Sequence, residues 1–257
     1  ISRTKDTFWI AATECSGIGC MKTSLAVLLR RKRILMLTST DFIQLADDTV
    51  VKAAGKYFEK LVFEPLGITK DAWIAGGCLR EWLQEKRIVK GCDIDVWCRD
   101  ANEVERIRKA AKDSKWTLTA DLPTSLNYKT PKGHWVQIIK QHFFDGPVET
   151  IKAFDFTVCA FALTYNDHFW MHQSSLLDMA MMRLKVIDLQ FPQSTLRRTY
   201  KYAEKGYRIC GGELGKVVDA IVAEAKQKEL EEAVAVQGED QTVVNGFSGG
   251  GRWNGLD

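Results

Sequence analysis

The chain has 257 residues, of which 46% are hydrophobic and 27% charged, a composition typical of a globular protein. No apolar run approaches the roughly 18–20 residues that a membrane-spanning helix needs, so we expect no membrane partner. The net charge of +3 is too small to indicate nucleic-acid binding by itself. The seven cysteines are scattered without a C-x-x-C pair, which predicts a reducing compartment, the cytoplasm, and no zinc site.

Residues 1–66 are expected to form a mostly helical N-terminal extension. Between residues 41 and 66 apolar side chains recur every three to four positions, which predicts an amphipathic helix broken near Asp47 and Asp48. Residues 16–23 superficially resemble a phosphate-binding P-loop, but Met21 stands where that loop requires glycine. The basic run 30–33 fits a solvated surface better than a contact with nucleic-acid phosphates.

The hydrophobic period changes after residue 67, where we expect a head domain over residues 67–190. A helical neck-like segment is expected over 191–235 and a flexible, glycine-rich tail over 236–257. The patterns predict strands at 72–75, 92–98, 116–120, 135–140, 153–163 and 169–172, and helices at 78–86, 102–112 with Asp100 as N-cap, 174–184, 193–206 and 214–234.

Two carboxylates stand two positions apart in the strand predicted at 92–98. Side chains at i and i+2 of a strand share a face, so Asp93 and Asp95 should project together, with Ile94 opposite. Neighbouring carboxylates raise each other's pKa unless a positive charge lies between them. Oxygen ligands favour Mg²⁺ or Mn²⁺, so the sequence predicts that this pair holds such a metal.

Gly76 and Gly77 follow the strand at 72–75 and open the next helix. Adjacent glycines at a helix start let the backbone approach a ligand, and the helix dipole favours an anion there. Arg80, one turn further along, adds a planar guanidinium that suits phosphate oxygens. Such a turn alone is more often a packing device, but next to a carboxylate pair it predicts a nucleoside triphosphate site.

The sequence Gly-Gly-Cys-Leu-Arg-Glu-Trp-Leu at 76–83, followed by Cys-Asp-Ile-Asp-Val at 92–96, resembles a known nucleotidyltransferase head domain. This head belongs to the CCA-adding tRNA nucleotidyltransferases and bacterial poly(A) polymerases of the DNA polymerase β superfamily. Residues 154–160, Phe-Asp-Phe-Thr-Val-Cys-Ala, resemble a second motif of that family, and residues 196–207 resemble the helix that begins its neck. The resemblance implies an α+β (mixed α/β) fold, with a small mixed sheet, helices on one side of it, and a short helical neck.

The resemblance also implies roles for further residues. Arg197, Arg198 and Lys201, on the neck-like helix, are expected to bind the nucleotide, and helical spacing places Arg197 and Lys201 on one face. Gln137 stands where the family carries an acidic residue, which makes Asp155 the candidate for a third catalytic carboxylate. The family's arginine pair before this motif is Ala153 and Phe154 here, its ribose-binding asparagine is Cys159, and its base-selecting Asp–Arg signature is not matched at residues 193–197.

The implied activity is transfer of a nucleoside monophosphate from an NTP, ATP among them, to an acceptor hydroxyl, with release of pyrophosphate. An RNA 3′ end, tRNA-like ends included, is the first choice of acceptor. The family's tRNA-binding body is not matched, so two alternatives stay open. One is transfer to a protein or small molecule, as in toxin-like relatives, and the other is a non-catalytic nucleotide- or nucleic-acid-binding protein on the same fold. Compact proteins of this kind occur in phage genomes, so we expect a phage origin.

Overall fold

The computed structural model describes residues 34–38, 41–45 and 49–244, with side chains described over 41–45 and 49–231. The P-loop-like segment 16–23 and the basic run 30–33 lie outside these residues. Among the described helices, none combines the length and the apolar character needed to cross a bilayer.

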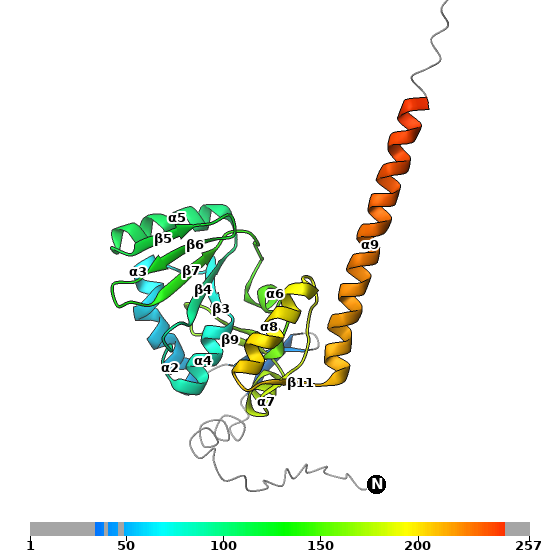
Figure 1. Cartoon of the computed structure of the whole chain (residues 1–257). Coiled ribbons are helices and arrows are strands. Elements are labelled where there is room, and N and C mark those ends of the chain that lie inside the picture. The colour runs from blue at the N-terminus through cyan, green and yellow to red at the C-terminus, as the bar shows by residue number, and fades with distance from the viewer. Residues whose placement is uncertain (1–33, 39–40, 46–48, 245–257) are drawn as a thin grey trace, which may run out of the picture.

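A mixed sheet forms the centre of the fold and has nine strands within the described residues, more than the small sheet expected from the sequence (Figure 1). Its order is β1-β2-β9-β8-β3-β4-β7-β6-β5, and only the β4–β7 pair is parallel. Five predicted strands agree with β3, β4, β5, β7 and β9 to within one residue at either end. The strands are β1 Ile34–Thr38, β2 Phe42–Leu45, β3 Ala72–Ala75, β4 Asp93–Cys98, β5 Thr117–Asp121, β6 Ser125–Lys129, β7 Trp135–Ile139, β8 Phe161–Leu163 and β9 Phe169–His172.

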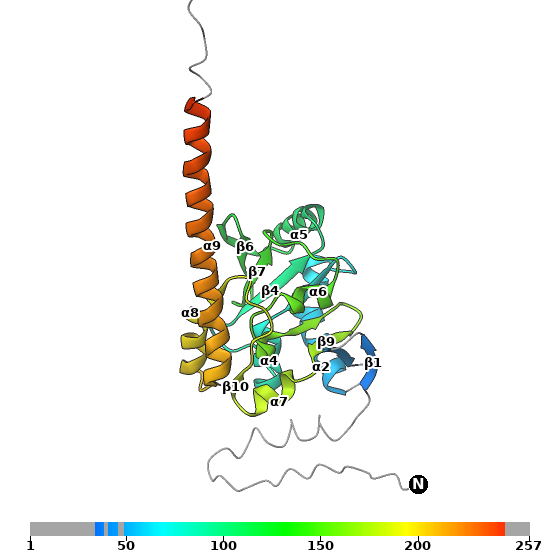
Figure 2. The same ribbon diagram turned by 90° about the vertical axis from the view of Figure 1, so that its right-hand side faces the viewer.

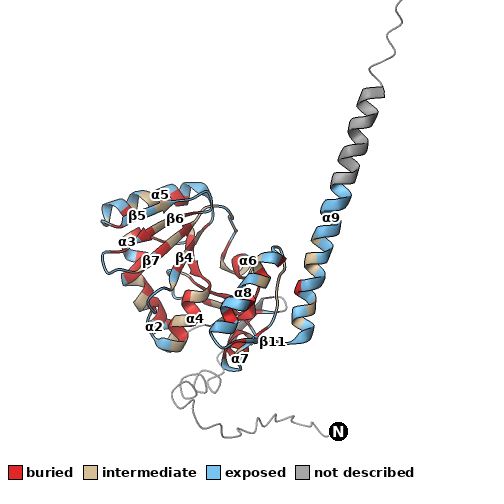
Figure 3. Cartoon of the chain, viewed as in Figure 1, coloured by how far each residue is buried: buried red, intermediate tan, exposed pale blue. Residues whose placement is uncertain are grey.

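Helices cover both faces of this sheet, whereas the sequence predicted helices on one side (Figures 1 and 3). All four side chains of β3 are buried, so both faces of this strand must be covered. Ala72 and Ile74 pack with α2, α4 and α5 on one face, while Trp73 and Ala75 pack with α6 on the other. The helices are α2 Thr49–Phe58, α3 Glu64–Leu66, α4 Gly77–Glu85, α5 Ala101–Asp113, α6 Pro147–Lys152, α7 Ser175–Ala180, α8 Pro192–Glu204 and α9 Gly211–Val244, with a π-helical turn at Glu59–Phe63 and a 3-10 turn at Thr157–Cys159.

The N-terminal part is less helical than predicted. β2 occupies the start of the segment 41–66, and it pairs antiparallel with β9, so that Phe42 and Ile43 become buried. The helical pattern was right from Thr49 to Leu66. The apolar side chains of β2 fit either period, and pairing with a distant strand decided between them.

The segment 153–163 is not the continuous strand that its apolar residues predicted. Phe156 forms an isolated bridge to Val186, a 3-10 turn follows, and only Phe161–Leu163 joins the sheet as β8. Side chains hold the turn: the Thr157 hydroxyl donates to Asp178 Oδ2 at 2.7 Å, and the Ser175 hydroxyl donates to the Thr157 carbonyl at 2.6 Å. Asp155 therefore lies outside the strands of the main sheet.

The C-terminal end of the chain also departs from prediction. The helix predicted over 174–184 ends at Ala180, and Arg183–Leu184 forms a short strand, β10, parallel to β11 at Arg208–Ile209. α9 continues to Val244, ten residues beyond its predicted end and into the segment expected to be a flexible tail. No proline interrupts residues 211–244, so the backbone hydrogen bonds of the helix can continue. Figures 1 and 2 show α9 projecting from the body.

Asp100 caps α5 as predicted: its side chain accepts a hydrogen bond of 2.9 Å from the Glu103 backbone N–H. Replacing Asp100 with alanine leaves that N–H without its partner. We expect the free energy of unfolding to fall by about 1 kcal/mol. Urea denaturation checks this, with Asp100→Asn as the control because asparagine caps a helix nearly as well. Equal losses in both variants would contradict the capping role.

Candidate active site

β4 carries the two aspartates on one face, as the alternation of a strand predicts. Ile94, Val96 and Cys98 are fully buried against the layer of α2, α4 and α5. Asp93 and Asp95 point to the opposite face, where Asp93 is exposed and Asp95 partly buried. The two carboxylates are therefore neighbours on the face that is only partly covered by helices.

The glycine turn lies against the second aspartate. Gly76 is the N-cap of α4 and has a φ of 107°, a conformation that L side chains rarely adopt. A Cβ added at Gly76 would lie 3.4 Å from Asp95 Oδ2. The start of α4 and the carboxylate pair, which we inferred separately from the sequence, thus meet in one place.

The charge around Asp95 is poorly balanced. Burial and the negative charge of Asp93 raise the pKa of Asp95 to about 7, while the positive charges of Lys201 and Arg198 oppose this rise. Among the described residues no hydrogen bond or ion pair holds the Asp95 carboxylate directly. A carboxylate pair in this condition fits a divalent cation, because a dication between the two oxygens removes their mutual repulsion.

Within the described residues, no third acidic ligand lies beside the pair. Gln137 is the register partner of Asp95 on β7, and its Nε2 donates a 3.4 Å hydrogen bond to Asp93 Oδ2. Asp155 is buried and forms a 2.6 Å ion pair with Arg198 of α8. No cluster of three acidic, histidine or cysteine side chains suited to a metal occurs in the described part of the chain. The donor set thus fits a metal held by Asp93 and Asp95, with water or phosphate oxygens completing it.

α8 carries the three predicted cations, and two of them lie close enough to Asp95 to act on its charge. Arg198 and Lys201, three residues apart, both act on the charge of Asp95, and both are exposed, as Arg197 is. Arg198 also bonds to Asp155, so it links this acid electrostatically to the pair on β4. Arg198 thus joins Lys201 beside Asp95, and a nucleotide contact by Arg197, which shares a helix face with Lys201, stays a prediction.

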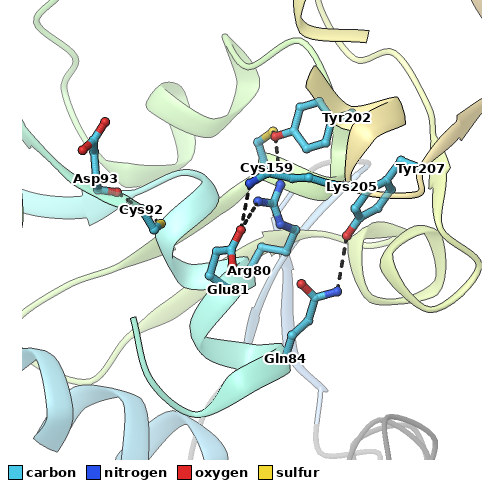
Figure 4. A network of polar contacts seen from close by, with 9 residues as sticks. All are labelled: Arg80, Glu81, Gln84, Cys92, Asp93, Cys159, Tyr202, Lys205 and Tyr207. Carbon is cyan, nitrogen blue, oxygen red and sulfur yellow. Dashed lines mark hydrogen bonds and ion pairs between the residues drawn. The ribbon is translucent and has the colours of Figure 1, made fainter. Parts of the chain in front are cut away.

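Arg80 is a buried residue between α4 and α8 (Figure 4). Its Nη1 donates to the Tyr202 hydroxyl at 2.9 Å and its Nη2 to Glu81 Oε1 at 2.9 Å. Its guanidinium carbon lies 5.1 Å from the ring centroid of Tyr202 and 5.8 Å from that of Tyr207. Lys205 donates to the same Glu81 oxygen at 2.9 Å. Contact between Arg80 and a triphosphate stays a prediction, since the bonds seen here fix α8 to α4.

Sequence reasoning placed Tyr202 and Tyr207 in a neck-like helix without giving them a role. Their partner Arg80 is more than a hundred positions away in the chain, and no spacing rule links the two. Cys159 contacts the Tyr202 hydroxyl, and the sequence did not predict this contact either. Burial and the charge of Asp155 raise the pKa of the Cys159 thiol to about 11, so this group is neutral at pH 7. Figure 4 shows these side chains converging between α4 and α8.

Stability of the metal-free protein should depend on the protonation of Asp95. Its pKa is about 7 in the folded chain against an ordinary value of 3.8, so folding takes up a proton between these pH values. Stability is therefore expected to fall as pH rises from about 4 to 7, and added Mg²⁺ should restore it above pH 7. Thermal unfolding at pH 5 and pH 8, with EDTA or Mg²⁺, checks this. Asp95→Asn should flatten the profile, and an unchanged slope in that variant would contradict the assignment.

Comparisons with known proteins agree with this fold. A tRNA-processing enzyme in its apo form is 16% identical with a TM-score of 0.50, covering 70% of this chain and 49% of its own. The CCA-adding enzyme of Thermotoga maritima complexed with tRNA is 16% identical with a TM-score of 0.49, covering 72% and 46%. The complex structure of a CCA-adding enzyme with CTP is 16% identical with a TM-score of 0.47, covering 70% and 43%. The chain spans less than half of the length of these structures.

At this identity the likeness concerns the fold alone, and the polymerase-β-like nucleotidyltransferase fold expected from the sequence is confirmed. No curated protein matches the chain. One family model does match, that of the Gabija anti-defense 2 family proteins, over residues 46–181. This match covers more than half of the 257 residues, and the chain therefore belongs to the Gabija anti-defense 2 family.

Proposed function

We propose that this protein is a metal-dependent nucleotidyltransferase that moves a nucleoside monophosphate from an NTP to an acceptor hydroxyl and releases pyrophosphate. The observation that carries the proposal is the meeting of Gly76, at the start of α4, with Asp95 of the unneutralised pair Asp93 and Asp95. A helix start suits phosphate, and a carboxylate pair suits Mg²⁺ or Mn²⁺. Phosphoryl transfer needs both within reach of each other.

Each residue has a role in this proposal. Asp93 and Asp95 hold the metal, which when bound neutralises phosphate charge and activates the attacking hydroxyl. Gly76, Gly77 and the start of α4 receive the triphosphate. The acceptor oxygen forms a bond to the α-phosphorus as the bond to pyrophosphate breaks, and the hydroxyl proton leaves to solvent or to a nearby base.

The cations of α8 complete the nucleotide site in this proposal. Lys201 and Arg198 already act on Asp95, and a triphosphate beside that residue brings negative charge that both can bind. Arg197, exposed on the same helix, is proposed to contact the nucleotide from outside. Asp155 serves as a third carboxylate only if Arg198 leaves it for the phosphates, because their 2.6 Å ion pair occupies it here. Arg80, held by Tyr202 and Glu81, positions α8 beside the phosphates.

An RNA 3′ end is the first choice of acceptor, since solved structures with this fold include enzymes that process tRNA. Family membership supports a second candidate. The description anti-defense indicates action against a defence called Gabija, and transfer of a nucleotide to a component of that defence would achieve it. In either case the protein works by modifying a target, and the phage origin expected from the sequence fits such a role.

Labelled NTPs test the proposal directly. The full chain is incubated with each α-³²P NTP and Mg²⁺ in three arms, which contain short RNAs, cell extract from a strain that carries Gabija, or no acceptor. Transfer of label to RNA supports the first candidate, and transfer to a protein supports the second. No transfer in any arm, with either Mg²⁺ or Mn²⁺, would overturn the proposed activity.

A further inference from the structure

One row of side chains crosses four strands on the face that carries the aspartates. Asp93 of β4 is in register with Trp135 of β7, which is in register with Lys129 of β6, and Lys129 is in register with Thr117 of β5. Residues in register on neighbouring strands point to the same face. The row therefore leads from the proposed metal site to β5, the last strand in the sheet order. Figure 1 shows these strands side by side.

Trp135 is unusual in this row because a large aromatic side chain is left exposed beside a carboxylate pair. It is 39% exposed, and its neighbours along β7, Val136 and Ile138, are fully buried on the opposite face. The ammonium of Lys129 lies 5.7 Å from the Trp135 ring centroid. Exposed aromatic faces with a nearby cation are the arrangement on which proteins stack single-stranded bases next to a phosphate.

Lysines gather along one edge of the sheet, which is formed by the first residues of β4, β7 and β5 and by the last residue of β6. The row of side chains lies at this edge. β4, β7 and β5 run in one direction, and each begins two or three residues after an exposed lysine, namely Lys90, Lys132 and Lys115. Lys129 ends β6 at the same edge. Within the described part of the chain none of these four lysines forms an ion pair. These four positive charges are therefore unpaired within the described residues, which suits a polyanion.

We infer that this face binds the 3′-terminal nucleotides of a single-stranded nucleic acid, with a base stacked on Trp135 and phosphates at Lys129 and the lysines of the edge. The inference deepens the proposed function, on which it rests, because it leads the terminal hydroxyl to Asp93. Two strand spacings, roughly 10 Å, separate Asp93 from Lys129. A ligand that touches both is therefore extended, as a polynucleotide is.

Fluorescence anisotropy tests the inference with 3′-hydroxyl ten-nucleotide RNA and DNA that carry a 5′ dye. Trp135→Ala should weaken binding about tenfold or more, since stacking of one base contributes that much. Lys129→Ala should weaken it a few-fold and reduce its dependence on salt concentration. The two oligonucleotides distinguish an RNA from a DNA partner.

Two matched controls keep the test specific. Tyr165→Ala removes an aromatic side chain that is 42% exposed on the turn between β8 and β9. Lys70→Ala removes an exposed lysine just before β3, which runs antiparallel to β4 and so begins at the opposite edge. Both should leave binding unchanged. Absence of binding, or equal loss in Tyr165→Ala and Trp135→Ala, would overturn the inference.

The outcome separates this inference from the proposed function. Label transfer from an NTP, without oligonucleotide binding that depends on Trp135, would overturn the nucleic-acid surface and leave the transferase in place. Binding of an oligonucleotide that depends on Trp135, without transfer from any NTP, would support the surface while overturning the transferase.

Discussion

Replacing Asp93 or Asp95 with asparagine should reduce nucleotide transfer by roughly a thousandfold or more, because each change removes a charged metal ligand that contributes several kcal/mol to the transition state. Asparagine keeps the size of the side chain, so the fold should persist. In Asp95→Asn the metal-free protein should be at least as stable as the unchanged chain at pH 8, since the substitution removes the buried charge and its repulsion by Asp93, which raise the pKa of Asp95 to about 7. Initial rates with labelled NTP and thermal unfolding measure the two effects.

A third aspartate serves as the matched control for this loss. Asp219 is exposed on α9, away from β4, and Asp219→Asn should transfer nucleotide at the normal rate. Two results would contradict the metal site. One is normal activity in both β4 variants, and the other is a loss of folding that accounts for the lost activity.

Arg80→Ala should lower the free energy of unfolding by about 3 kcal/mol. The side chain is 3% exposed, and its loss breaks bonds to Tyr202 and Glu81 and leaves the Tyr202 hydroxyl without this donor in a buried place. Because these contacts join α4 to α8, we expect α8 to loosen and the KM for NTP to rise as well. Urea denaturation gives the first effect and steady-state kinetics the second.

Lys205→Ala provides the comparison for Arg80. Lys205 bonds to the same Glu81 oxygen at 2.9 Å, but its side chain is 40% exposed, so its removal should cost less than about 1 kcal/mol. Tyr202→Phe keeps the ring under the guanidinium and removes only the hydroxyl. The fall in its free energy of unfolding should therefore lie between those of Lys205→Ala and Arg80→Ala. Similar losses for Lys205→Ala and Arg80→Ala would show that the buried contacts do not hold α8.

The sequence predicted the parts of the fold that local chemistry determines. The strand at Ala72–Ala75, the helix that follows Gly76, and the cap at Asp100 each depend on residues a few positions apart. β2 and the segment around Phe156 were misjudged, because their structure depends on partners more than a hundred positions away or on side-chain bonds to α7. β6 was missed because Ser125 and Asn127 weaken the strand pattern that Leu126 and Tyr128 form on the buried face.

The same division applies to the candidate site. The shared face of Asp93 and Asp95 follows from strand geometry, and burial on β4 agrees with it. The ion pair of Asp155 with Arg198 and the burial of Arg80 between two tyrosines could not be predicted, since both depend on how α8 folds back onto the head. Gln137 was identified as the residue in place of an acid, and the structure shows it directly opposite Asp95.

One turn of α8 serves two tasks. Tyr202 secures it to α4 through Arg80, while Arg198 and Lys201 act on the charge of Asp95. A rigid helix turns as a unit, so any substitution that improves its anchorage also reorients its cations. Because Arg198, Lys201 and Tyr202 lie on one turn, we expect changes at these positions to be coupled in diverging members of the family.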